Sequence, residues 1–167
     1  MEAVHPITTH LPIALSLVVP TIMFIVLFFS MRGTWASSTW FIPVLLAALV
    51  FGGAYYARDQ GGQDAHHVVE VYGEDVAGPA IHDHAVWSKY FYWTYAGVFV
   101  VSFLGLLMPR RKVLRMVAFF LSLGALVPMY YTGMLGGELV YEKGFSAAFV
   151  KEMPIKQISA LSGSEKE

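Results

Sequence analysis

Four long windows without a single charged side chain set the strongest limit on how this chain can fold. They cover residues 11–31, 34–57, 90–109 and 116–137. Each is long enough for a helix to cross a bilayer, which takes about 20 apolar residues. Charged residues make up only 14% of the chain, whereas a soluble domain carries about 25%. The sequence therefore predicts an all-α protein, an integral membrane four-helix bundle.

The breaks between these windows predict the domain organisation. We expect membrane spans at residues 9–31, 36–57, 85–109 and 113–137, within a transmembrane domain of residues 1–145 followed by a polar tail of residues 146–167. Pro6 and Pro12 predict that the first helix begins near Thr8 or Thr9, because proline fits only the first turn of a helix. Pro128 predicts a kink in the fourth span.

Basic residues predict the orientation in the membrane. The connection between the third and fourth spans and the connection between the first and second spans together carry Arg32, Arg110, Arg111, Lys112 and Arg115. The segment 58–89 on the other side is rich in Asp and Glu and is expected to be a solvated loop. Cytoplasmic loops carry an excess of Lys and Arg. We therefore expect a multi-pass protein of a bacterial inner (cytoplasmic) membrane, with both termini on the non-cytoplasmic side.

Several classes of chemistry are excluded or disfavoured by what the sequence lacks. The chain has no cysteine, which excludes disulfides, thiolate metal sites and covalently attached c-type haem. A net charge of -1 gives no indication of nucleic-acid binding. Phosphate-binding glycine loops, nucleophile elbows and zinc-protease helices are also missing from the sequence. We therefore do not expect the chain to be catalytic alone, although it can be a subunit of an oxidoreductase complex.

The histidines are the most informative polar residues, because all of them are predicted at the outer face. The six are His5, His10, His66, His67, His82 and His84. Asp83 is the expected N-cap of the third span, which places His84 in the first turn of that helix and His10 in the first turn of another. Two imidazoles at similar depth on two helices can serve as the axial ligands of haem b. Arg58 or Lys89 at the same boundary would pair with the propionates.

Other uses of these histidines remain open. His5 is the substitute ligand for the haem, in extended chain ahead of Pro6, and His82 is a further candidate. A quinone is the alternative cofactor. A zinc or copper site made from His66, His67, His82 and His84 is a weaker possibility, because no ligand spacing on a regular helix supports it. Interfacial histidines can also bind only headgroups or water, which would leave a structural membrane anchor.

Motifs at the two ends of the transmembrane domain resemble those of a known family. Residues 5–14 read His-Pro-Ile-Thr-Thr-His-Leu-Pro-Ile-Ala, and residues 136–144 read Gly-Gly-Glu-Leu-Val-Tyr-Glu-Lys-Gly. This pattern, with His84 or His82 opening the third helix, is similar to the bacterial four-helix transmembrane domain of unknown function of the DUF2231 type. Leu11 stands where the family has an aromatic residue. The positions that match the family's histidines and closing motif are His5, His10, His84, Gly136, Gly137, Leu139, Val140 and Tyr141.

The resemblance, over about residues 5–145, implies a redox context. Members of the family occur alone or joined to Rieske iron–sulfur or cytochrome c domains. We therefore expect a membrane subunit of an electron-transfer complex that binds haem b near the outer face and relays electrons between quinol and an extracytoplasmic carrier. The carrier would be a cytochrome c or a Rieske protein. A cofactor-free anchor and a quinone- or metal-binding subunit are the alternatives.

Overall fold

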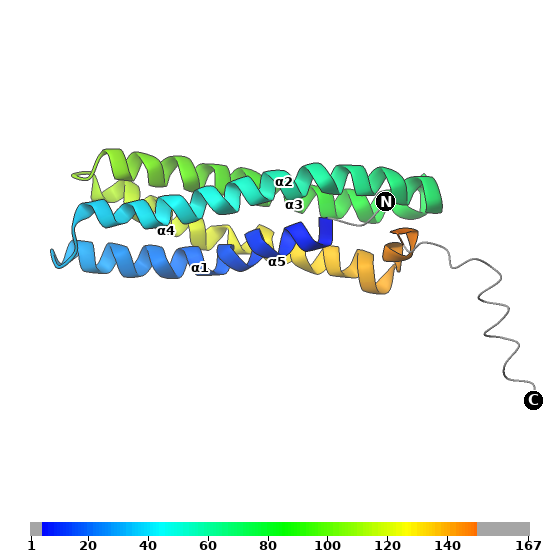
Figure 1. The fold of residues 1–167 in the computed structure, drawn as a ribbon, viewed down its shortest axis with the longest axis horizontal. Coiled ribbons are helices and arrows are strands. Elements are labelled where there is room, and N and C mark those ends of the chain that lie inside the picture. Colours follow the sequence, from blue (N-terminus) through cyan, green and yellow to red (C-terminus); the bar gives the residue numbers. More distant parts are fainter. Residues whose placement is uncertain (1–4, 150–167) are drawn as a thin grey trace, which may run out of the picture.

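A computed structural model describes the backbone of residues 5–149 and the side chains of residues 10–149, which form an elongated helical bundle (Figure 1). The prediction of an all-α fold is confirmed, as is that of four helices long and apolar enough to cross a membrane. The fourth of these is made of several consecutive helical pieces. The helices are α1 (His5–Met31), η1 (Ser37–Trp40), α2 (Phe41–Tyr72), α3 (Glu74–Leu107), α4 (Lys112–Gly124), α5 (Leu126–Gly137), η2 (Glu138–Glu142, a π-helix) and η3 (Phe145–Phe149).

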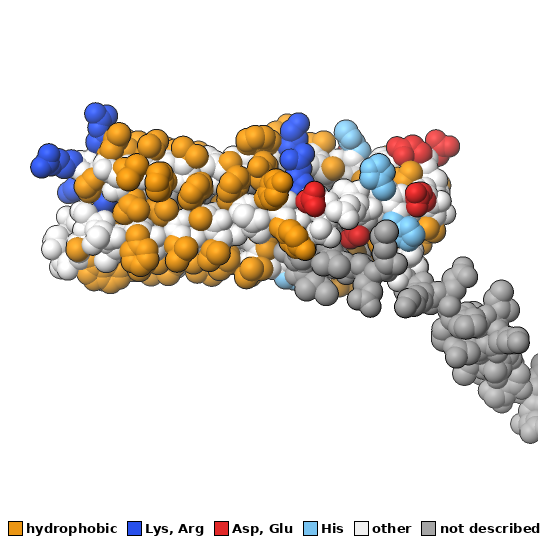
Figure 2. Space-filling model, turned by 45° about the horizontal axis from the view of Figure 1, so that its top comes forward, with side chains coloured by type: hydrophobic (Ala, Val, Ile, Leu, Met, Phe, Trp, Pro, Cys, Tyr) orange, Lys and Arg blue, Asp and Glu red, His pale blue; other side chains and the backbone are white. Residues whose placement is uncertain are grey.

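The bundle buries one apolar stripe of each helix and leaves a second apolar surface outside. Val19, Val50 and Val98 are fully buried on α1, α2 and α3, whereas Phe24 and Phe120 are more than half exposed. Figure 2 shows this outer apolar surface between a group of Lys and Arg at one end and a region of His, Asp and Glu toward the other. Apolar side chains on the outside of the helices are compatible with contact to lipid.

Two prolines, Pro20 and Pro109, leave a backbone carbonyl without its usual helical partner, and a side chain from another helix replaces it. Pro20 has no N–H for the carbonyl of Ser16, which instead accepts a 3.0 Å hydrogen bond from the Tyr95 hydroxyl. Pro109 likewise cannot bond the carbonyl of Gly105, which accepts 3.0 Å from Nε of Arg115. Unsatisfied carbonyls are costly in hydrocarbon, so these two bonds fix α3 against α1 and α4.

The expected irregularity at Pro128 takes the form of an interruption in the fourth helix. α4 ends at Gly124, α5 begins at Leu126, and Ala125 separates them. Pro128 offers no N–H to the carbonyl of Gly124, four residues earlier, so the regular ladder is broken at that position. The chain then continues from α5 into the π-helix η2.

The prediction of a solvated loop at residues 58–89 is wrong. α2 continues to Tyr72 and α3 begins at Glu74, so this region is a helical hairpin with a turn at Gly73. Gly73 has φ 86°, a left-handed conformation that glycine adopts without strain. Asp83 is therefore inside α3 rather than its N-cap, and His84 lies ten residues into that helix. The first helix also begins earlier than expected, so that the backbone of His5 is helical rather than extended.

The first and last described residues lie toward the end of the bundle that carries the α2–α3 turn (Figure 1). The connections α1–η1 and α3–α4, which carry Arg32 and Arg110 to Lys112, lie at the other end. We call these the hairpin end and the basic end. The histidines of the described region and most of its carboxylates belong to the hairpin end.

Candidate functional site

A cavity of about 590 Å³ lies at the hairpin end, between α2, α3 and the segment of residues 138–149 that follows α5. We call this last segment, made of η2 and η3, the closing segment. The volume falls within the range of small-molecule sites, about 300–1,000 Å³. The lining residues are Tyr55, Arg58, Asp59, Gly61, Gly62, Asp64, Ala65, Val68, Ile81, His84, Ala85, Ser88, Tyr92, Gly136, Leu139, Val140, Phe145, Ser146 and Phe149.

His84 is the histidine of this lining, and it is half-buried between the cavity and the bundle. Its imidazole lies directly against Gly136 of α5: a Cβ on that glycine would be 3.1 Å from Cε1 of His84. The ring also borders a small internal void of about 20 Å³, which Pro12 of α1 and Thr132 of α5 help to line. The third-helix histidine and the closing Gly-Gly pair therefore meet, and the missing side chain of Gly136 makes room for the imidazole.

Arg58 brings a positive charge to the same cavity. Its guanidinium lies 5.6 Å from the ring centroid of Tyr92, which also lines the cavity. A contact of this kind holds a cation over an aromatic face. Asp59 and Asp64, on the same helix, add two carboxylates to the lining. Arg58 and His84, both predicted at one membrane boundary, therefore line the same cavity.

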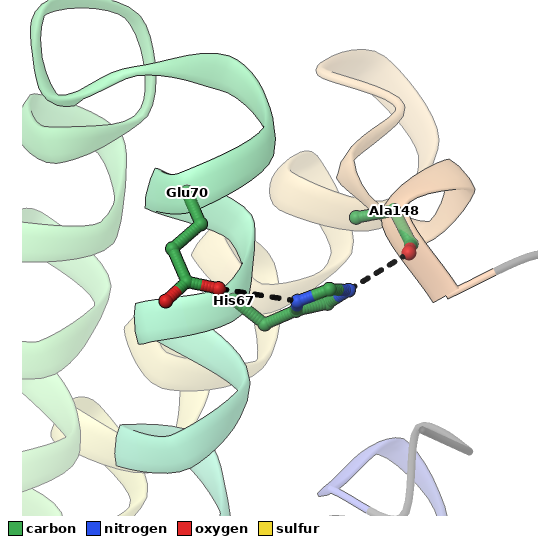
Figure 3. Close-up of polar contacts among 3 residues, drawn as sticks. All are labelled: His67, Glu70 and Ala148. Atoms are coloured by element: carbon green, nitrogen blue, oxygen red, sulfur yellow. Dashed lines mark hydrogen bonds and ion pairs between the residues drawn. The ribbon is translucent and has the colours of Figure 1, made fainter.

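Side chains of the α2–α3 hairpin bind the closing segment, and the sequence did not predict these contacts. The hydroxyl of Tyr72 donates a 3.3 Å hydrogen bond to the carbonyl of Gly144. Nε2 of His67 lies 3.1 Å from the carbonyl oxygen of Ala148, and Nδ1 of the same ring lies 3.7 Å from a carboxylate oxygen of Glu70 (Figure 3). The buried ring of Phe145 packs on Tyr72, with ring centroids 5.0 Å apart.

The other predicted ligands lie away from the cavity. His10 is exposed, and it is two residues from Pro12, which is buried against Gly53 of α2. His10 lines neither the cavity nor the small void beside His84. The structure therefore does not bring the two predicted axial ligands together.

The remaining predicted residues are placed as follows. His82 and Lys89 are exposed on α3 and are not part of the lining. His66 is also exposed, and the His67 ring is taken up by Ala148 and Glu70. The side chain of His5 lies outside the described residues. Within residues 10–149, no group of three or more His, Asp or Glu side chains is arranged to hold a metal ion.

The cavity combines apolar walls with a few polar groups, as sites for amphipathic ring compounds do. Leu139, Val140, Phe145 and Phe149 form an apolar side, and His84 and Arg58 supply an imidazole and a guanidinium. No family model, no curated protein and no solved structure matches the chain. The resemblance of its end motifs to the four-helix domain of unknown function therefore stays a prediction.

Proposed function

We propose that this chain is a membrane subunit of an electron-transfer complex and that the cavity binds haem b. The observation that carries the proposal is that His84 and Arg58 line one cavity together with apolar and aromatic walls. Imidazole is an axial ligand for haem iron, and the polarity of the pocket tunes what the haem does. Haem b would supply one-electron redox chemistry, with electrons passing between quinol and an extracytoplasmic carrier.

The residues that would hold the haem can be assigned roles. Nδ1 or Nε2 of His84 would bind the iron, and Gly136 would fix the plane of the imidazole by packing against Cε1. Arg58, held over Tyr92, would pair with a propionate. The described lining holds no second histidine. His10, His5 and His82 remain the other candidate ligands.

The sidedness that we propose follows from charge. The basic end would face the cytoplasm by the positive-inside rule, in a bacterial cytoplasmic membrane, and both termini would lie on the other side. The cavity and the acidic hairpin would then face the extracytoplasmic space. Asp59, Glu70, Glu74 and Asp75 are exposed there and would favour a partner with a basic surface, such as a cytochrome c, through electrostatic steering.

One observation favours quinol as a second candidate ligand. The described lining holds one imidazole but two carboxylates, Asp59 and Asp64. A hydroquinone ring can donate its hydroxyl protons to an imidazole and to a carboxylate, whereas carboxylates beside haem propionates would repel them. The apolar side of the cavity would take the ring in either case.

A reduced-minus-oxidised visible spectrum of the detergent-purified protein tests the proposal, together with solvent extraction of bound quinone. A b-type band supports the haem site. Bound quinone without a band supports the second candidate. A folded, colourless protein that carries neither would overturn both and leave a cofactor-free membrane anchor.

A further inference from the structure

The wall of the cavity is not equally anchored on all sides. Two sides are α2 and α3, which belong to the packed bundle: they pack extensively on each other, α2 packs also on α1, and α3 packs also on α4 and α5. The third side is the closing segment, which contributes Leu139, Val140, Phe145, Ser146 and Phe149 to the lining. This third side is joined to the bundle by α5 at one end and rests on the hairpin by side-chain contacts.

Those contacts are few and local. Tyr72 bonds the carbonyl of Gly144, and His67 bonds that of Ala148. Phe145 inserts into a small cluster with Val68 and Ala77, separate from the main core of the bundle. Tyr72 and His67 each bind a backbone carbonyl through one side-chain atom, so each makes a single hydrogen bond beside a ring contact.

The backbone of the closing segment has the features of a joint. η2 is a π-helix, in which the N–H of Lys143 bonds the carbonyl of Glu138. π-helical turns are rare in proteins, and those that occur are often found at functional sites. Gly144 follows with φ 68°, a left-handed conformation that ends the helical run. A change of direction at Gly144 would carry Phe145 and Phe149 away from the cavity together.

We propose that the closing segment is the gate of the cavity and that His67 and Tyr72 are its latches. Opening would break the two bonds to Ala148 and Gly144, withdraw Phe145 from between Val68 and Ala77, and expose the α2 wall near Ala65. This regulation of ligand exchange rests on the proposed binding role of the cavity. The opening itself takes place with or without a ligand, so it can be tested separately.

Single cysteines give a direct test, because the natural chain has none. Ala65→Cys places a thiol in the cavity lining, and Gln63→Cys places one on an exposed part of the same helix outside the lining. The rate of reaction with a water-soluble maleimide is measured in each. The latch variant is His67→Phe with Tyr72→Phe, which removes both hydrogen bonds and keeps both aromatic rings.

Two hydrogen bonds together raise the ratio of closed to open molecules by a factor of about ten. We therefore expect the latch variant to raise the reaction rate of the thiol at position 65 about tenfold and to leave that at position 63 unchanged. Equal rates at position 65 with and without the latches would overturn the gate. A parallel rise at position 63 would also overturn it, because it would indicate that the hairpin unfolds.

The test of the gate by thiol reaction rates is independent of whether the haem-binding proposal holds. If the purified protein carries haem, the latch variant should also transfer it to apomyoglobin faster than the natural protein does. If the protein carries no haem, the haem-binding proposal fails, while the ratio of the two thiol rates still decides whether the closing segment opens. Circular dichroism of the two cysteine variants, with and without the latch substitutions, checks that the helical content is kept.

Discussion

The basic end and the hairpin end of the bundle are closed in different ways. At the basic end, Arg115 is only 2% exposed, yet it donates to the carbonyls of Gly105 and Ser37 and lies over the ring of Trp40. Trp40 is itself fully buried and donates 3.0 Å to the carbonyl of Ser102. At the hairpin end, a cavity of about 590 Å³ is covered by a segment that is held by two single hydrogen bonds and by the packing of Phe145 and Phe149.

The difference suggests a division of roles: the basic end stabilises the bundle, and the hairpin end holds the proposed binding site. A buried cation that donates to the Gly105 carbonyl resists movement, because any shift leaves that carbonyl without the donor that Pro109 cannot supply. Among the described residues of the hairpin end no buried cation forms such a centre, and an open volume lies beside an imidazole. Elements that move for binding come from the least stable parts of a protein. Substitutions that weaken stability should therefore act most strongly at the basic end.

The largest effect is expected for Arg115→Met. The methionine keeps most of the buried volume but leaves the Gly105 carbonyl without a donor, since Pro109 offers no N–H. A loss of about 3 kcal/mol in the free energy of unfolding is expected, measured by denaturant titration in detergent. Arg110→Met, at an exposed position of the same end, is the control and should change stability by less than about 0.5 kcal/mol. Equal losses would remove the distinction between the two ends.

Two glycines compare the ends directly. An alanine Cβ at Gly105 would lie 3.1 Å from Cγ of Arg115 and 3.3 Å from Nε1 of Trp40, and both groups are fixed by hydrogen bonds. We expect Gly105→Ala to lower the melting temperature, with a loss of about 2 kcal/mol from overpacking. A neutral result would show that the Arg115–Trp40 centre can yield, contrary to its description as rigid.

Gly136→Ala is the counterpart at the hairpin end, and its cost in stability should be smaller. The imidazole of His84, 3.1 Å from the new Cβ, can rotate toward the cavity. We expect a loss under about 1 kcal/mol, together with a changed optical spectrum if a haem is bound. Gly133→Ala is the matched control on α5, since a Cβ there meets nothing within 4 Å. A greater loss at position 136 than at position 105 would reverse the comparison.

Tyr95→Phe tests the middle of the bundle and should have an effect close in size to that of Gly136→Ala. The substitution removes the donor to the Ser16 carbonyl, which Pro20 cannot replace. A loss of about 1 kcal/mol in unfolding free energy is expected. Tyr90→Phe, whose side chain is more than half exposed, should be neutral in the same titration. If the two variants were indistinguishable, the carbonyl of Ser16 would have another donor.

The four helices long and apolar enough to cross a membrane were predictable because each contains most of a window free of charge. The helical hairpin was not, because Gly61-Gly62, Gly78-Pro79 and the many carboxylates of residues 58–89 read as a loop. The signal that was missed is periodicity: Tyr55, Arg58, Asp59, Gly62 and Ala65 recur at intervals of three and four and all line the cavity.

The candidate site was predictable in part. His84 and Arg58 were identified from their place at the membrane boundary, and both line the cavity. The exposure of His10 could not be predicted, because it depends on which face of α1 packs on α2. The contact between Pro12 and Gly53 determines that face. His67 and Tyr72 could not be assigned, because their partners are backbone carbonyls 81 and 72 residues away, and carbonyls leave no pattern in a sequence.

The central claim is that the cavity beside His84 holds the redox ligand. Reduced-minus-oxidised spectra of the natural protein, His84→Ala and His82→Ala test it most directly, since His82 is exposed two residues away on the same helix. We predict a b-type band in the natural protein, no band in His84→Ala, and an unchanged band in His82→Ala. A band that survives in folded His84→Ala would contradict the claim and place the haem elsewhere in the bundle.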